Sequence, residues 1–176
     1  MRNISVNAQG RDIDVEVYEP VGASGPVPGI LMLHEAFGLL DCYREDAIEL
    51  AGQGYLVFLP NLYTGGAVRY CIRAMVSEAA RKNRSNNGPN LEVHDLLDAL
   101  KAEPDCNGRL GVLGACMTGG FVLHMAKRDV VHAPVVYHHS FGLQGSGVPK
   151  EDNLDGIVKL QGHWAKLDPL CPARRR

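Results

Sequence analysis

Residues 111–120 read Gly-Val-Leu-Gly-Ala-Cys-Met-Thr-Gly-Gly and place one cysteine between two apolar segments. The continuous apolar run at 110–113 is typical of a strand buried on both faces, and residues 117–127 have the pattern of an apolar helix. Small residues let a strand turn sharply into a helix and project the side chain at the turn, an arrangement called a nucleophile elbow. The stretch therefore favours Cys116 as a nucleophile over the alternative of a buried structural cysteine.

The position of Cys116 predicts two supports for its reactivity. Amide groups at a helix N-terminus favour negative charge, so we expect the thiolate to be stabilised. The backbone N–H of Met117 follows directly and is expected beside the oxyanion of a reacting carbonyl group. The usual elbow has glycine two residues after the nucleophile, whereas this chain has Thr118 there. We therefore expect an elbow that is slightly altered or more strained.

Apolar patterns on both sides of this segment predict strands that alternate with helices. Apolar and polar residues alternate from Ile4 to Val17, around a turn-like stretch, which indicates an antiparallel hairpin with one wet face. Further strands are expected at 30–33, 55–60, 134–137 and 157–160. Helices are expected from Asp41 to Gly52 or Gly54, over 67–82, and from a cap at Asn90 through Leu100. The alternation predicts an α/β domain with a largely parallel sheet and helices on both faces.

Length and composition exclude several classes of protein. The 176 residues fit one domain, with 45% hydrophobic and 22% charged residues, close to the globular average. A net charge of −2 excludes an overall basic surface for nucleic acid. No apolar run approaches the roughly 18–20 residues that span a bilayer, and the N-terminus lacks a signal-peptide pattern, so we expect a cytoplasmic protein without a membrane partner. Five cysteines without short spacings favour neither a disulfide framework nor a zinc site, and we expect most thiols to be reduced.

A second candidate segment, His-Glu-Ala-Phe-Gly at residues 34–38, directly follows the first buried strand of the α/β pattern. In α/β sheets, the loops after the carboxyl ends of the strands line the active-site crevice. We therefore expect this loop to face the elbow and to offer a second backbone amide to an oxyanion. Glu35 is a candidate for a buried acid that takes the thiol proton. The alternative is a solvated loop carboxylate.

Several motifs, taken in their order, resemble the dienelactone hydrolases, which are cysteine-dependent members of the α/β-hydrolase fold. The motifs are Leu-His-Glu at 33–35 with Gly-Leu at 38–39, Leu-Pro-Asn-Leu-Tyr at 59–63, Pro-Asp-Cys-Asn-Gly-Arg at 104–109, and Gly-Ala-Cys-Met at 114–117. The resemblance covers roughly residues 29–170. It implies that residues 1–176 form a single but incomplete domain, an α/β-hydrolase-like three-layer sandwich with a mostly parallel central sheet and an N-terminal antiparallel hairpin. The last strand and helix of the fold are expected to be missing.

The resemblance also implies roles for individual residues. Cys116 would be the nucleophile, Glu35 the acid that activates it, and the backbone N–H groups of Met117 and Ala36 the oxyanion hole. Two arginines are candidates for binding a substrate carboxylate, or else are solvated helix residues: Arg69 and Arg73. No metal or cofactor is implied.

The end of the chain departs from the pattern of the family. The triad of this fold runs nucleophile, acid, histidine. Asp168 fits the position of the acid, but only eight residues follow it and none is histidine. Three histidines at predicted strand ends are candidates to act as the base instead: His138, His139 and His163.

These observations lead to hypotheses from different functional classes. The first is a hydrolase of small esters or lactones that forms an acyl-enzyme on Cys116. The alternative is a truncated, catalytically impaired or inactive family member that retains the fold and binds small acids. A third reading is a thiol redox sensor in which Cys42 or Cys171 approaches Cys116. Without a further strand, the strand expected at 157–160 becomes an exposed sheet edge, and we expect either a homodimer through that edge or a chain that is only marginally stable.

Overall fold

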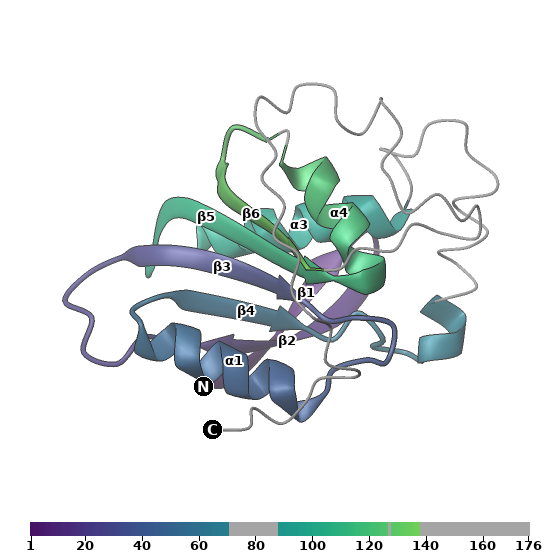
Figure 1. Cartoon of the computed structure of the whole chain (residues 1–176), viewed down its shortest axis with the longest axis horizontal. Coiled ribbons are helices and arrows are strands. Elements are labelled where there is room, and N and C mark those ends of the chain that lie inside the picture. Colours follow the sequence, from purple (N-terminus) through teal and green to yellow (C-terminus); the bar gives the residue numbers. More distant parts are fainter. Residues whose placement is uncertain (71–87, 127, 138–176) are drawn as a thin grey trace.

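The computed structural model describes residues 1–70, 88–126 and 128–137, and within these ranges the chain forms one mixed sheet flanked by helices (Figure 1). The strand order is β1-β2-β4-β3-β5-β6. β4, β3, β5 and β6 run parallel, whereas β2 is antiparallel to both of its neighbours. The bounds of the strands are β1 Arg2–Ala8, β2 Arg11–Tyr18, β3 Val27–Leu33, β4 Leu56–Pro60, β5 Cys106–Ala115 and β6 Val131–Tyr137.

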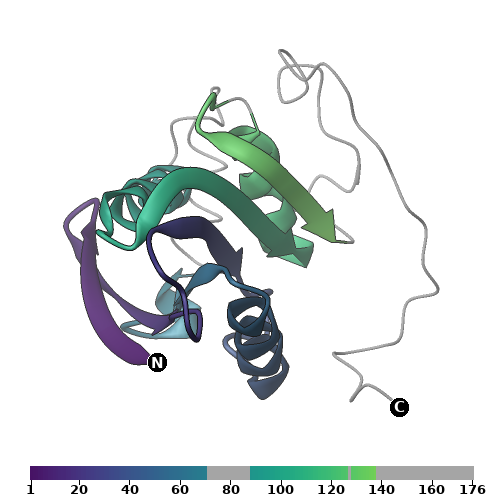
Figure 2. The same ribbon diagram turned by 90° about the vertical axis from the view of Figure 1, so that its left-hand side faces the viewer.

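Helices cover both faces of the sheet (Figures 1 and 2). α1 (Asp41–Gly52) packs on one face, and α3 (Gly88–Ala102) and α4 (Gly119–Met125) pack on the other. The buried side chains form two clusters, one that joins the hairpin with α3 and α4 and one that joins the sheet with α1. These are the three layers that the alternation of strands and helices predicts.

Consecutive residues of the central strands enter opposite clusters. In β3, Leu31 and Leu33 lie in the cluster with α3, whereas Met32 lies in the cluster with α1. In β4, Phe58 belongs to the first cluster and Leu59 to the second. All five side chains are at most 1% exposed. Burial on both faces explains why these strands carry continuous apolar runs instead of alternating ones.

β1 and β2 form the predicted hairpin, with Ile4 opposite Val15 and Val6 opposite Ile13. The side chains of Ile13 and Val15 are buried, whereas Asp14 between them is exposed. Period-two alternation places every second side chain on one face of a strand, so the hairpin has one buried and one wet face. The hairpin prediction is confirmed.

Two helix starts differ from the prediction. α1 begins at Asp41, but the capping position is Leu40 and no side chain caps the helix. Asp41 instead pairs with Arg44 on the same turn, at 2.8 Å. α3 begins two residues before Asn90, so the predicted cap lies inside the helix and is buried. Pro89 occupies the first turn, where a missing N–H has no helical partner to lose, and this allows the earlier start.

Some predicted elements lie outside the described residues. Residues 67–70 are helical, as expected for the start of the helix predicted over 67–82, and the rest of that helix is not among the described residues. The strand predicted at 157–160 is also outside them, together with the sheet edge expected to support a homodimer. Across the described ranges, none of the helices is both long and apolar enough to span a membrane.

The carboxyl ends of the parallel strands lie along one edge of the sheet. Leu33, at the end of β3, pairs with Gly114 near the end of β5, and β4 ends beside β3 at Pro60. The segment after each strand therefore leaves the sheet at this edge, which is where an α/β sheet places its active site. Both candidate segments of the sequence, 34–38 and the turn at Cys116, lie here.

Arg11 ties the hairpin to the elements around this edge. Its guanidinium pairs with the fully buried Glu92 of α3 at 2.8 Å and donates to the carbonyl oxygens of Leu62 and Thr64 at 3.1 and 3.0 Å. Its central carbon lies 5.5 Å from the centre of the Tyr70 ring, within cation–π range. One side chain thus connects β2, α3 and the segment that follows β4.

We predict that Arg11→Met lowers the free energy of unfolding by about 3 kcal/mol, because it leaves the carboxylate of Glu92 buried without its guanidinium partner. The value is taken from the lower end of the range for breaking a buried ion pair, because Arg11 itself is partly exposed. Urea unfolding followed by circular dichroism measures the loss. The double variant Arg11→Met/Glu92→Met should recover much of it, because the buried charge is then absent. A loss below about 1 kcal/mol in the single variant, as for a surface pair, would contradict this role.

Candidate active site

Cys116 stands at the turn between β5 and α4. β5 ends at Ala115, a 3₁₀ turn spans Cys116–Thr118, and α4 begins at Gly119. Cys116 has a φ of +52°, in the left-handed region that residues other than glycine rarely adopt. Such strain costs on the order of 1–3 kcal/mol and gathers at functional sites. Cys116 is half-buried and does not take part in a disulfide bond. This is the strand–turn–helix geometry that the sequence predicts.

The turn depends on the absence of a side chain at Gly114. A Cβ at this position would lie 2.6 Å from Cγ2 of Val122 in α4 and 2.8 Å from the carbonyl oxygen of Thr118. Both distances are well inside van der Waals contact. Glycine therefore allows α4 to fold back directly against the end of β5.

Thr118, where the usual elbow has glycine, reinforces the turn through its hydroxyl group. Its Oγ1 accepts a hydrogen bond from the backbone N–H of Ala115 at 3.0 Å. The hydroxyl proton has two carbonyl acceptors within reach, Ala115 at 2.9 Å and Leu33 at 3.4 Å. The side chain is fully buried. Threonine is thus accommodated because it satisfies buried backbone groups of the elbow and of the neighbouring strand β3.

The register of the sheet brings Glu35 to the same edge as Cys116. Leu33 of β3 pairs with Gly114 of the adjacent parallel strand. Glu35 and Cys116 each follow this pair by two residues, so they leave neighbouring strands at equivalent positions. Glu35 is 7% exposed. The structure therefore gives a buried carboxylate, which the sequence left open against a solvated one.

Tyr43 of α1 also reaches this pair, although it is not among the site residues that the sequence predicts. Its hydroxyl oxygen accepts a hydrogen bond from the backbone N–H of Glu35 at 3.2 Å. Burial, reinforced by the nearby charge of Glu35 and to a lesser degree of Cys116, raises the pKa of Tyr43 to about 12. The Tyr43 hydroxyl is therefore within electrostatic range of both residues and stays protonated. The sequence offers one sign of this role: the side chain of Tyr43 ends in a hydroxyl group, although the residue lies on the buried face of the helix that follows the loop.

His34 is fully buried and holds the loop that carries Glu35. Its Nδ1 lies 2.7 Å from the carbonyl oxygen of Glu35, and its Nε2 lies 3.0 Å from the backbone nitrogen of Leu62. A carbonyl oxygen only accepts and a backbone N–H only donates, so Nδ1 carries the proton and Nε2 does not. Burial lowers the pKa of His34. The ring is a neutral link between the loops after β3 and β4.

Tyr63 supports the next peptide of the same loop. Its hydroxyl donates to the carbonyl oxygen of Ala36 at 2.7 Å, and its ring packs edge-on against His34 with centroids 4.9 Å apart. Gly38 closes the loop, since its N–H donates to the carbonyl oxygen of Glu35 at 3.1 Å. Its φ of +90° explains why glycine stands there.

The other predicted site residues divide into two groups. Ala36 is exposed in the loop after β3, and Met117 lies in the turn after β5, so both proposed oxyanion amides belong to segments at this edge. Arg69 is exposed in the helical residues 67–70. The remaining candidates lie outside the described residues: Arg73, His138, His139, His163 and Asp168.

The redox state of the cysteines and the grouping of potential metal ligands also bear on the predictions from the sequence. Among the described residues, Cys106 and Cys116 are reduced, whereas Cys42 is disulfide-bonded and is an exception to the expected reduced state. Within the same part of the chain, no group of three or more histidine, cysteine, aspartate or glutamate side chains is placed to hold a metal ion.

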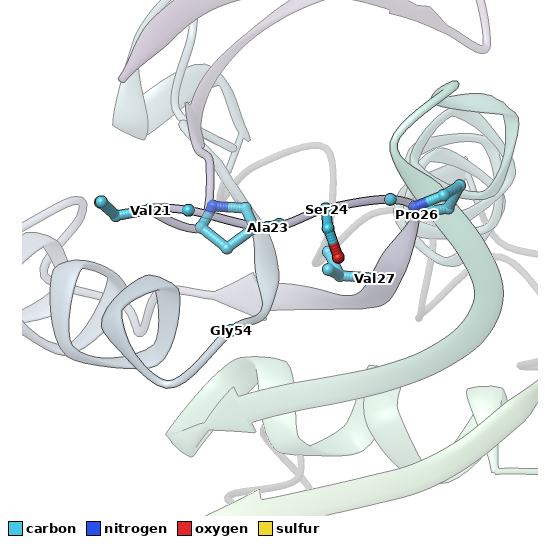
Figure 3. Close-up of a pocket in the computed structure, with 9 residues that line it drawn as sticks. Val21, Ala23, Ser24, Pro26, Val27 and Gly54 are labelled. Atoms are coloured by element: carbon cyan, nitrogen blue, oxygen red, sulfur yellow. The ribbon is translucent and has the colours of Figure 1, made fainter.

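An open hollow of about 500 Å³ lies at the opposite edge of the sheet (Figure 3). It is lined by residues 20–27, which precede and begin β3, and by Gly54, which precedes β4. These are the amino ends of the parallel strands, whereas Glu35 and Cys116 follow the carboxyl ends. The hollow is therefore separate from the candidate active site.

The topology of the sheet and the turn at Cys116 together indicate the fold class of this protein. A sheet in the order β1-β2-β4-β3-β5-β6, with β2 antiparallel to its neighbours and a sharp strand–turn–helix connection after β5, is the arrangement of the α/β-hydrolase fold. Residues 13–176 match the sequence pattern of the dienelactone hydrolase family. The chain belongs to the dienelactone hydrolase family.

Known relatives extend beyond the length of this chain. The curated carboxymethylenebutenolidase of Pseudomonas putida is 29% identical over an alignment of 164 positions, and the match covers 88% of this chain and 66% of that protein. The solved structure of m3DLH has a TM-score of 0.68 at 24% identity and covers 89% of this chain and 64% of its own. A dienelactone hydrolase-like promiscuous phosphotriesterase from metagenomic libraries has a TM-score of 0.65 at 24% identity, with 78% and 58% covered. The chain spans about two thirds of the curated relative, and the two structures establish likeness of fold.

We predict that Gly114→Ala lowers the free energy of unfolding by about 1–3 kcal/mol, because the new Cβ forces α4 away from β5. Gly52→Ala is the matched control, since a Cβ there meets nothing within 4 Å and the residue ends a helix. The control should change stability by less than about 0.5 kcal/mol. Urea unfolding of both variants measures the difference. Equal stabilities would mean that the elbow tolerates a side chain at Gly114.

We predict that stability decreases with acid partly through His34. Its lowered pKa means that the unfolded chain binds a proton near the ordinary pKa of about 6.5 while the folded chain resists it. The stabilisation is therefore present above about pH 6.5 and is lost below it. Urea unfolding at pH 7.5 and pH 5.5 should show a smaller drop for His34→Gln than for the wild type. His94, whose pKa burial also lowers, contributes equally to both proteins. Identical drops would contradict the prediction.

Proposed function

We propose that this chain hydrolyses small esters or lactones through a thiolate at Cys116. The observation that carries the proposal is the strained elbow, with φ of +52° at Cys116, together with the buried Glu35 in the loop that follows the adjacent parallel strand β3. Membership of the dienelactone hydrolase family supports the same chemistry. The name of the Pseudomonas putida relative, carboxymethylenebutenolidase, indicates an unsaturated lactone as the substrate of that protein. A small lactone is therefore the first substrate class to consider for this chain.

In the proposed mechanism, Glu35 takes the proton of the Cys116 thiol, and the resulting thiolate attacks the carbonyl carbon of the substrate. The new S–C bond converts the carbonyl oxygen into an oxyanion, which the backbone N–H groups of Met117 and Ala36 would stabilise. Collapse of this intermediate breaks the C–O bond of the ester and leaves a thioester on Cys116. The leaving alcohol takes up a proton, and in a lactone it stays attached to the acyl group.

Water then hydrolyses the thioester, releases the acid and restores the thiol. A positioned base for this water contributes about 10²–10⁴-fold in rate. The residues proposed for this step are Asp168 with one of His138, His139 and His163, and all of them lie outside the described part of the chain. If no base serves the water, acylation is faster than deacylation and product appears as a burst. Arg69 and Arg73 stay proposed partners for a substrate carboxylate.

We predict a Cys116-dependent burst of p-nitrophenol when the chain reacts with p-nitrophenyl acetate. Cys116→Ala should abolish the burst, and Glu35→Gln should slow it by about 10²-fold, because the thiol then lacks its proton acceptor. Stopped-flow absorbance measures the burst amplitude and rate constant. Cys106→Ala is the matched control, because Cys106 is the other reduced cysteine of the described residues and lies at the start of β5, away from the elbow.

The control should keep the full burst amplitude. Equal, near-background rates for the wild type and Cys116→Ala would overturn the proposal and favour the alternative, a family member that retains the fold without the chemistry. A burst without subsequent turnover would identify the deacylation step as the impaired one.

A further inference from the structure

One peptide unit of the loop after β3 links His34 to the proposed oxyanion hole. The carbonyl oxygen of Glu35 accepts the Nδ1 proton of His34 at 2.7 Å. The N–H of the same peptide belongs to Ala36 and is the proposed second donor to the oxyanion. A hydrogen bond to the carbonyl of an amide fixes the plane of the peptide and polarises its N–H, which strengthens that group as a donor.

The tautomer of His34 is determined by its second partner. The backbone N–H of Leu62 donates to Nε2 at 3.0 Å, so the proton of the neutral ring stands on Nδ1 and is directed at the Glu35 carbonyl. Full burial and the edge-on ring of Tyr63 hold the imidazole in this orientation. The two ring nitrogens thus have separate tasks, since Nε2 anchors the ring and Nδ1 acts on the peptide.

Other side chains hold the peptide units on either side. The N–H of Glu35 donates to the hydroxyl of Tyr43, and the hydroxyl of Tyr63 donates to the carbonyl of Ala36. The N–H of Gly38 also reaches the Glu35 carbonyl at 3.1 Å. The course of the loop therefore has supports besides His34. Loss of the Nδ1 donor should alter the orientation and polarity of one peptide more than the position of the Glu35 side chain.

We propose that His34 is a positioning residue that orients and polarises the Ala36 N–H toward the oxyanion formed on attack by Cys116. The proposal rests on the proposed function, because it assigns His34 a task in that reaction. It goes beyond a general role in loop structure, since it ties the effect of His34 to steps in which a carbonyl oxygen gains charge. A reaction of Cys116 that forms no oxyanion should be insensitive to the Nδ1 donor.

Two substitutions separate the tasks of the ring nitrogens. The amide nitrogen of asparagine is bonded to Cγ, as Nδ1 is in histidine, so His34→Asn keeps a donor for the Glu35 carbonyl and loses the anchor to Leu62. The amide of glutamine extends one bond further, to the reach of Nε2, so His34→Gln keeps an acceptor for the Leu62 N–H and loses the Nδ1 donor. The proposal predicts opposite effects of the two variants on acylation and on stability.

The experiment compares two reactions of Cys116 in the full chain. The first is acylation by p-nitrophenyl acetate, read from the burst rate constant, which passes through an oxyanion. The second is alkylation by iodoacetamide, followed at the Cys116 peptide by mass spectrometry, in which the S–C bond forms as iodide leaves and no oxyanion appears. His34→Gln should slow acylation at least tenfold, and by less than the roughly 10²–10³-fold that follows removal of an oxyanion donor, because the Ala36 N–H itself remains. It should change alkylation less than twofold. His34→Asn should acylate within about threefold of the wild type while unfolding at lower urea concentration.

Each outcome bears on the proposal. Unchanged acylation in His34→Gln overturns it, and so does an equal slowing of acylation and alkylation, which would mean that His34 maintains the site as a whole. If His34→Gln does not fold, a tenfold slower acylation in His34→Asn with normal alkylation overturns the proposal, because the donor is then present. A wild-type chain without a Cys116-dependent burst overturns the proposed function itself, and alkylation of Cys116 distinguishes that case from loss of the oxyanion hole alone.

Discussion

The close approach of β5 and α4 at Gly114 controls the geometry of the candidate site. With no Cβ between them, the helix starts one short turn after the strand ends, and Cys116 takes up the change of direction at a positive φ. Thr118 then secures the turn by bonding the backbone of the strand it leaves and of β3. β3 is in register with β5 at this point, and this register aligns Glu35 with Cys116. A strained residue is maintained here because packing on all sides determines its conformation.

Support for the loop that carries Glu35 extends to the N-terminal hairpin. Leu62 accepts a hydrogen bond from Arg11 at its carbonyl and donates its N–H to His34. Arg11 is in turn held by the buried Glu92 of α3. A continuous series of contacts therefore runs from a helix on one face of the sheet to the peptide between Glu35 and Ala36. The hairpin, which contributes no residue to the proposed chemistry, helps to fix the loop that does.

The two edges of the sheet differ in the side chains that they carry. The hollow near Gly54 is lined by backbone and small side chains at the amino ends of the strands, without a charged group. The carboxyl edge instead combines the thiol of Cys116, the buried carboxylate of Glu35, the buried phenol of Tyr43 and the buried imidazole of His34. In α/β proteins the active site lies outside the carboxyl ends of the strands, in loops that the rigid sheet holds in place.

The sequence by itself determined the succession of strands and helices along the chain, the hairpin, and the turn that carries Cys116. These features follow from local patterns, because continuous apolar runs, period-two alternation and small residues at a turn each leave a mark on adjacent positions. Local pattern also identified Glu35 as a candidate, but whether it was buried, and which groups surrounded it, depended on strand register and on residues distant in the chain. The start of α3 before Asn90 and the roles of Tyr43 and Thr118 were likewise set by tertiary contacts. Only the folded structure decided the tautomer of His34, because its two hydrogen-bond partners come from different loops and meet at the edge of the sheet.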